Sequence, residues 1–139
     1  MEDAEPSLEL RSQCQSPQLT LFYYLPKSLW VRITEETNRY CQQNIARRAQ
    51  AILAQHGSRQ KETLAQVRRR LKVNAGYPTH EVKHVIGLLI ARMLCPQKRS
   101  FTAHWSMTED GVVPAGSFGR FLGRNRCQGI LRDLHFVDN

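Results

Sequence analysis

The strongest constraint on the fold of this chain is the segment from Thr79 to Leu94, which lies between Pro78 and Pro96. Proline is tolerated at the start of a helix but not in its interior, so these residues bound a predicted helix. Apolar residues cover most of the circumference of that helix: Val82, Val85, Ile86, Leu88, Leu89, Ile90, Ala91, Met93 and Leu94. A helix that is apolar nearly all round needs neighbours on several sides. The pattern therefore predicts a central helix, capped by Thr79 and surrounded by others.

A long helix is predicted over residues 28–56, because the apolar positions there recur mostly at spacings of three and four. Gly57 stands where a C-cap would end this helix. Ser58 can cap a further helix that ends at the VNAGYP stretch before residue 79. The apolar stripe of that helix comprises Leu64, Val67 and Leu71.

The remaining segments predict shorter elements. Residues 19–26 (LTLFYYLP) form an extended segment or, as we prefer, a strap over the helices, because no second strand is available to pair with them. Residues 95–116 contain prolines and glycines and predict a loop anchored by Trp105, followed by two short helical segments around 118–122 and 127–134. The expected fold class is all-α, an irregular helical bundle of about four to five helices.

The length of 139 residues allows one modest core and is too short for two. Residues 1–18 lack apolar periodicity, so we expect a disordered acidic tail followed by one helical unit over residues 19–139. The longest apolar run, residues 85–91, is far shorter than the roughly 18 to 20 residues of a membrane span, and the acidic N-terminus does not resemble a secretory signal. We therefore expect an intracellular protein with no membrane partner, whose four scattered cysteines are reduced thiols.

Charge is distributed unevenly along the chain, which carries a formal net charge of +8. Residues 1–36 hold three basic and six acidic side chains, whereas residues 37–132 hold seventeen basic and four acidic ones. Arginine predominates, and its planar guanidinium suits bidentate contact with phosphate, so DNA is the expected partner and a merely solvated basic surface is the alternative. The candidate DNA-binding residues are Arg47, Arg48, Arg59, Lys61, Arg68, Arg69, Arg70, Lys72, Arg120, Arg124 and Arg126.

The string HEVKH, residues 80–84, matches the HExxH pattern in which two histidines bind zinc and the glutamate activates a water. The longer zinc-protease pattern fails at Ile90, where a third histidine should stand. The start of a helix also carries positive dipole charge, which opposes a dication beside His80. A zinc-dependent hydrolase using His80, Glu81 and His84 is therefore the minor alternative, and the principal expectation is a chain without a metal site.

Other catalytic templates fit less well. The glycines of GSFGRFLG, residues 116–123, neither follow a predicted strand nor match a phosphate-binding loop, and no GxSxG nucleophile motif is present. We expect no enzymatic activity from this chain and no small-molecule substrate.

The second half of the chain resembles the N-terminal part of the piggyBac transposase-derived domain. The resemblance rests on EVKHVIGLLIARML followed by HWSMTEDGVVPAGSFGRFLGRNRCQGILRDLHFVDN. These stretches contain an acidic residue before a GLL-bearing helix, a Trp-Ser pair, an arginine-bearing helix and a closing LHF.DN-like signature. The residues concerned are Glu81, Gly87 to Leu89, Trp105, Ser106, Phe118 to Leu122, Arg126, Ile130, Leu131 and Leu134 to Asn139. Residues 33–40 (ITEETNRY) also resemble the first helix of the family, where a Thr-Asn pair such as Thr37-Asn38 is common, whereas residues 47–76 look longer and more basic than the usual connection.

The resemblance implies a nuclear, cut-and-paste DNA transposase whose ribonuclease-H-like core uses three aspartates to hold two divalent metals such as magnesium. In the family the first of those aspartates follows the LHF.DN-like signature, so no catalytic residue is expected here, and Asp133 and Asp138 belong to the region of that signature. The chain would correspond to the first part of a helical dimerisation and DNA-binding domain, with DNA and a second copy as partners and no cofactor of its own. The resulting interpretation is a non-catalytic transposase fragment, and a protein-interaction module without nucleic acid is a further alternative.

Overall fold

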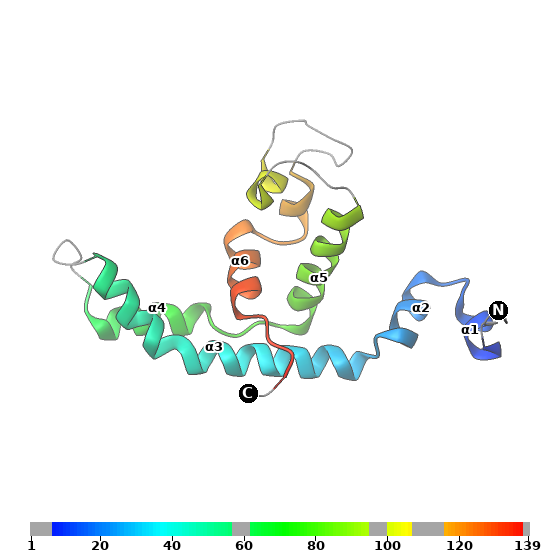
Figure 1. Ribbon diagram of the computed structural model, residues 1–139, viewed down its shortest axis with the longest axis horizontal. Helices are drawn as coiled ribbons and strands as arrows, with labels where there is room; N and C mark the ends of the chain where they lie inside the picture. Colours follow the sequence, from blue (N-terminus) through cyan, green and yellow to red (C-terminus); the bar gives the residue numbers. More distant parts are fainter. Residues whose placement is uncertain (1–6, 57–61, 95–99, 107–115, 138–139) are drawn as a thin grey trace, which may run out of the picture.

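The computed structural model describes residues 7–56, 62–94, 100–106 and 116–137. Over these ranges the chain is an irregular, all-α bundle, as predicted, and contains no strand (Figure 1). None of the helices in the described ranges combines the length and the apolar character that a membrane crossing requires.

Helix α3 (Lys27–His56) organises the bundle, because α4 (Leu64–Asn74), α5 (Thr79–Leu94) and α6 (Arg124–Asp133) all pack against it (Figure 1). Its 30 residues correspond to about 45 Å of helix at 1.5 Å per residue, which is long enough to contact three partners in turn. The prediction of one long helix in this region is confirmed. The prediction that the helix over residues 79–94 would be central is wrong.

Helix α5 buries one face and leaves the other exposed. Val82, Val85 and Leu88 are buried, whereas Met93 is 78% exposed and Leu94 is 77% exposed. The flanking prolines predicted the bounds of α5 well, but the apolar pattern did not predict its surroundings, because among the described helices only α3 and α6 make substantial contacts with it. Thr79 is the first residue of the helix rather than its cap.

Helix α4 begins later than predicted. Its N-cap is Thr63, whose hydroxyl accepts from the Gln66 backbone N–H while the Gln66 side chain accepts from the Thr63 backbone N–H, completing a capping box. Ser58, the predicted cap, lies outside the described residues. The segment between α4 and α5 turns at Gly76, whose φ of 101° is unfavourable for any residue with a Cβ.

Two short helices precede α3, where the sequence predicted a disordered tail and a strap. Helix α1 (Leu8–Gln13) lies within the predicted tail, and α2 (Pro17–Tyr24) replaces the extended strap. The Ser16-Pro17 pair explains α2, because the Ser16 hydroxyl caps the helix and proline is favoured at its first position. Both helices lie at the N-terminal end of α3, away from α4 (Figure 1).

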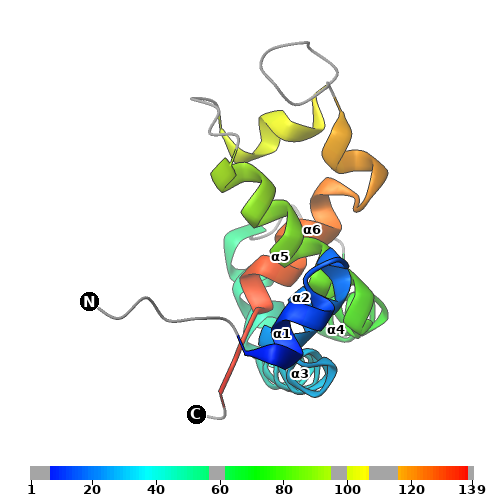
Figure 2. The same ribbon diagram turned by 90° about the vertical axis from the view of Figure 1, so that its right-hand side faces the viewer.

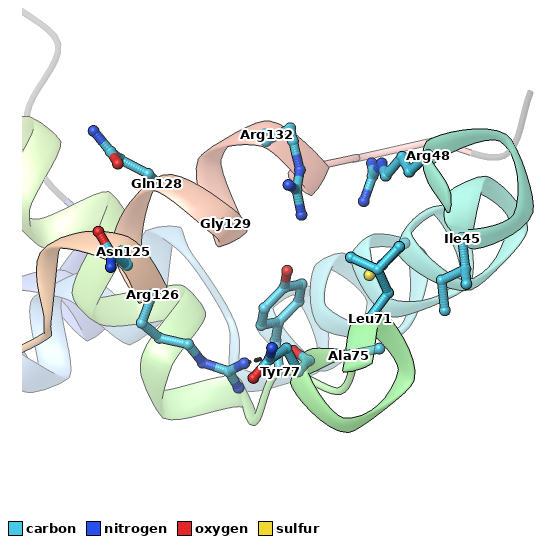
Figure 3. Close-up of a pocket in the computed structure, with 12 residues that line it drawn as sticks. Ile45, Arg48, Leu71, Ala75, Tyr77, Asn125, Arg126, Gln128, Gly129 and Arg132 are labelled. Carbon is cyan, nitrogen blue, oxygen red and sulfur yellow. Dashed lines mark hydrogen bonds between the residues drawn. The ribbon is translucent and has the colours of Figure 1, made fainter. Parts of the chain in front are cut away.

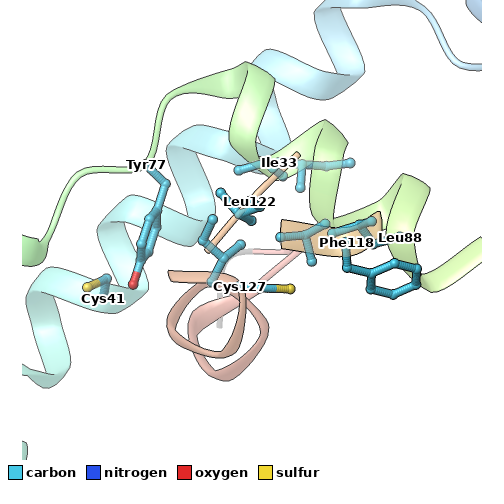
Figure 4. Close-up of a cluster of buried hydrophobic side chains, with 10 residues drawn as sticks. Ile33, Cys41, Tyr77, Leu88, Phe118, Leu122 and Cys127 are labelled. Atoms are coloured by element: carbon cyan, nitrogen blue, oxygen red, sulfur yellow. The ribbon is translucent and has the colours of Figure 1, made fainter. Parts of the chain in front are cut away.

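The main hydrophobic cluster is formed where α3, α5 and α6 meet (Figure 4). It comprises Ile33, Cys41, Tyr77, Val82, Val85, Leu88, Phe118, Leu122, Cys127 and Ile130. Cys41 and Cys127 are buried free thiols, Cys14 is an exposed one, and Cys95 lies outside the described residues. Burial raises the pKa of Cys127 to about 11, so this thiol is an inert part of the core.

Residues distant in sequence are clamped to α3 by two adjacent side chains. The Asn38 amide donates to the Tyr77 carbonyl at 2.9 Å and accepts from the Tyr77 N–H at 2.7 Å. The Thr37 hydroxyl oxygen lies 3.3 Å from both the backbone nitrogen and the carbonyl of His135. Thr37 and Asn38 therefore fix the entry to α5 and the exit from α6 on one helix.

Two 3₁₀ helices, η2 (Phe101–Trp105) and η3 (Ser117–Arg120), cover the end of the α5–α6 pair that is remote from α3 (Figure 2). The predicted anchoring role of Trp105 is confirmed, since its indole N–H donates to the Leu122 carbonyl at 2.8 Å. Phe118 is buried between Trp105, at an edge-to-face centroid distance of 5.3 Å, and the stacked ring of His104 at 4.4 Å.

The buried His104 imidazole makes this covering layer sensitive to acid. Burial, assisted by the nearby charge of Arg92, lowers the pKa of His104 below its ordinary value of 6.5, and its Nε2 has no hydrogen-bond partner within the described residues. The His104 imidazole therefore binds a proton more readily in the unfolded chain than in the folded one. The contribution of neutral His104 to the free energy of unfolding is fully present above pH 6.5 and is lost as the pH falls below that value.

We therefore expect the midpoint of thermal unfolding to fall as the pH is lowered from about 7.5 to about 5.5, and to fall less in a His104→Phe variant that keeps the stacking ring. His84→Phe, which replaces an exposed imidazole, should retain the wild-type pH dependence. Circular dichroism melts at several pH values measure both slopes, and equal slopes in wild type and His104→Phe would contradict the assignment.

Candidate nucleic-acid interface

The most concentrated basic surface in the described part of the chain lies on α4. Burial of Val67 against the rest of the fold turns the neighbouring positions of α4 outward. Ala65, Arg68, Arg69, Lys72 and Val73 line a shallow hollow of about 540 Å³ there. The lining includes three cations and no carboxylate, so this hollow attracts anions.

The four basic candidates on α4 differ in their surroundings. Arg69 and Lys72 are exposed, whereas Arg68 is half-buried and its Nε lacks a hydrogen-bond partner among the described residues. Arg70 lies outside the lining of the hollow, and its guanidinium is 3.1 Å from the Glu62 carboxylate. Arg68, Arg69 and Lys72 are therefore the cations available to an anion in the hollow.

The basic candidates on α3 separate into one exposed and one engaged residue. Arg47 is exposed to solvent. Arg48 is only 16% exposed, and its guanidinium forms an ion pair with the buried Asp133 carboxylate at the end of α6. Arg59 and Lys61 lie outside the described residues.

The basic candidates near the C-terminus separate in the same way. Arg120 and Arg124 are exposed. Arg126 instead donates to the Glu81 carboxylate at 2.8 Å and to the carbonyls of Asn74 and Gly76 at 2.8 and 2.7 Å, with its guanidinium 4.6 Å from the centre of the Tyr77 ring. Arg126 therefore ties α6 to the start of α5, a structural role that the sequence did not indicate.

Asp133 is the most strongly connected buried charge among the described residues, a role that its place beside the closing signature did not indicate. Its carboxylate accepts from the Tyr77 hydroxyl at 2.7 Å and from Arg132 at 3.2 Å, and it pairs with Arg48. Burial alone would raise the pKa of Asp133, but hydrogen bonds from Arg132, Arg48, Tyr77 and Cys41 lower it to about 2. Burial and the same hydrogen bond raise the pKa of Tyr77. The Asp133 carboxylate is therefore ionised at neutral pH, and its contacts join α3, the α4–α5 segment and α6.

The two histidines of the HEVKH string lie on the exposed face of α5, whereas Val82 between them is buried. His80 and His84 are exposed, with ring centroids 5.9 Å apart, but the Glu81 carboxylate is occupied by Arg126. Within the described ranges no cluster of three metal-ligating side chains includes these histidines. The carboxylate that would have to activate a water is thus held in an ion pair, which disfavours the hydrolase alternative.

Comparisons of the chain with models of protein families, with curated proteins and with solved structures gave no match. Function is therefore inferred from the chain's own residues.

Proposed function

We propose that this chain is a non-catalytic DNA-binding module that contacts phosphates through α4 and derives from the N-terminal part of a piggyBac-type transposase. The observation that carries the proposal is the hollow on α4, where Arg68, Arg69 and Lys72 gather with no carboxylate in the lining. Such a surface neutralises phosphates and releases counterions, which supplies binding without dependence on base sequence. The protein would act in the nucleus.

The relation to the transposases is supported by what the residues of the resemblance do. Thr37 and Asn38 clamp the segments around His135 and Tyr77, and the Glu81 carboxylate receives the Arg126 guanidinium. These residues are therefore contact partners across the fold rather than scattered matches, as expected for a signature that preserves a scaffold.

The absence of catalysis belongs to the same proposal. Asp133 is held by two arginines and a tyrosine, so its lone pairs are committed to the scaffold. In the transposases the metal-binding aspartates follow the closing signature, so the proposal assigns Asp133 a scaffold role and no metal ion.

Titration of duplex DNA over a series of salt concentrations tests the DNA proposal. We expect the logarithm of the affinity to fall linearly with the logarithm of salt concentration, and the double variant Arg69→Ala/Lys72→Ala to reduce that slope by about 2 units through loss of two phosphate contacts. The variant should weaken binding equally for unrelated DNA sequences, as fluorescence anisotropy can measure.

A matched control removes two exposed cations from the N-terminal end of α3, the end that lies away from α4 (Figure 1). Lys27→Ala/Arg32→Ala lowers the net charge equally but lies away from α4, so its salt slope should stay close to that of the wild type. An equal loss in both double variants would mean that total charge, rather than the α4 surface, attracts DNA, and a wild-type affinity insensitive to salt would remove the proposal.

The exposed face of α5 favours a second candidate function, a protein-interaction module that includes self-association as a homodimer. His84, Gly87, Ile90 and Met93 recur at helical spacing along that face, which is unusually apolar near its end. Sedimentation of the wild type and of Ile90→Ser/Met93→Ser distinguishes this candidate: a dimer that dissociates in the variant supports it, and a monomeric wild type argues against self-association.

A further inference from the structure

A second hollow of different character lies between the C-terminal half of α3, the segment linking α4 to α5, and α6 (Figure 3). Its volume of about 600 Å³ falls within the range of small-molecule sites. It shares no lining residue with the basic hollow on α4. The two can therefore be tested separately.

One side of this cavity carries an excess of positive charge. Arg48 and Arg132 both line it, and both direct their guanidinium groups at the single carboxylate of Asp133. The third arginine of the lining, Arg126, is already balanced by Glu81. Two cations sharing one anion leave a net charge of one at this wall, which favours a monoanion.

Arg48 and Arg132 also have N–H groups that do not contact Asp133. A guanidinium offers five N–H groups, and Asp133 occupies only part of this capacity on each side chain. Arg132 is 55% exposed, so it can reach a ligand at the mouth of the cavity without leaving a buried gap. The exposed amides of Asn125 and Gln128 lie on the same helix and add polar groups to the rim.

The opposite wall is apolar. Ile45 of α3, Leu71 of α4 and Ala75 beyond it line the cavity together with the buried Cys41 thiol (Figure 3). A small inorganic anion would leave this wall in contact with water only, whereas an apolar group attached to the anion would cover it. The cavity thus combines features that suit an amphipathic ligand.

We propose that this cavity binds a small carboxylate with an apolar body, the carboxylate facing Arg48 and Arg132 and the apolar body facing Ile45, Leu71 and Ala75. Arginine and carboxylate match in geometry as well as charge, because the planar fork donates two parallel hydrogen bonds. The inference stands independently of DNA binding, since it uses α6 and α3 rather than the basic hollow of α4.

Calorimetric titration of the full chain with phenylacetate tests the proposal, with acetate and phenylethanol as probes of the anionic and apolar halves alone. We expect saturable binding of one phenylacetate per chain, and binding at least about tenfold weaker for each half probe. Acetate binding as tightly as phenylacetate would reduce the site to an ion contact and overturn the proposal, as would the lack of saturable phenylacetate binding.

Variants locate the site. Arg132→Gln should weaken phenylacetate binding about tenfold by removing a charge-assisted hydrogen bond, while retaining the Arg48–Asp133 pair. Arg124→Gln, an exposed arginine of the same helix outside the lining, should bind like the wild type. A filling substitution, Ala75→Leu, should abolish binding without altering the charge of the site. Wild-type affinity in both Arg132→Gln and Ala75→Leu would place the ligand elsewhere and overturn the proposal.

Discussion

Replacement of Asp133 by asparagine is expected to lower the free energy of unfolding by about 3–5 kcal/mol, because the change removes the charge that two arginines share. Asp133 is fully buried, and Arg48 is only 16% exposed, so this guanidinium cannot recover its hydration by a small movement. Arg132 is 55% exposed and can turn to solvent. The cost therefore arises mainly from the Arg48 charge left without a counter-ion.

Urea unfolding followed by circular dichroism measures this loss. The control is Glu35→Gln, which removes an exposed carboxylate from α3 and should change stability by no more than about 0.5 kcal/mol. The double variant Arg48→Met/Asp133→Asn should be more stable than Asp133→Asn alone, since it removes the unpaired cation and fills its place with an apolar side chain. If Asp133→Asn unfolds like the wild type, the ion pairs contribute nothing to the fold.

The main helices were predictable because the signals that form them are local. The apolar spacing over residues 28–56 and the prolines around residues 79–94 specify α3 and α5 through contacts within a few turns. The cap of α4 is Thr63 rather than the predicted Ser58, and Thr63 and Gln66 stand in the sequence at the spacing of three that a capping box requires. The Ser16-Pro17 pair that starts α2 is also a local signal, but the polar residues that precede it favour a disordered segment.

Which helix lies at the centre was not predictable, because apolar composition reports how much surface a helix offers and not which partners cover it. Helix α5 is the more apolar, yet α3 has the length to contact α4, α5 and α6. The partners of Arg48 and Arg126 were hidden for a related reason. Arg48 pairs with a carboxylate 85 positions away in the sequence, and Arg126 pairs with one 45 positions away. The net charge of a chain does not indicate which basic side chains form such ion pairs.

The corrected list of cations sharpens the candidate site. Removing Arg48, Arg70 and Arg126, which are engaged with acidic side chains, leaves the exposed positive charge on α4 and at a few separate positions such as Arg47. Among the described candidates, the compact basic surface that remains is the one on α4, while the exposed Arg47, Arg120 and Arg124 lie on other helices. That surface is the smallest set of residues on which the DNA proposal depends.

Replacement of Phe118 by alanine is the second change with a large expected effect, a loss of about 3–5 kcal/mol in the free energy of unfolding. Phe118 is 2% exposed, and its ring lies in the main hydrophobic cluster against Trp105 and His104 (Figure 4). The truncation leaves a cavity and removes the aromatic surface on which η2 rests. The short 3₁₀ helices η2 and η3 cannot close that cavity by themselves.

Phe121, three residues later in the chain, provides a matched control for this variant. It has the same side chain but is 60% exposed, so Phe121→Ala should cost no more than about 1 kcal/mol. Urea unfolding of both variants gives the difference, and indole fluorescence reports whether Trp105 loses its packing in Phe118→Ala alone. Because both substitutions delete the same atoms from the same short segment, only burial distinguishes them. Equal losses in the two variants would therefore contradict the position of η3 in the core and, with it, the attachment of the covering layer to α5 and α6.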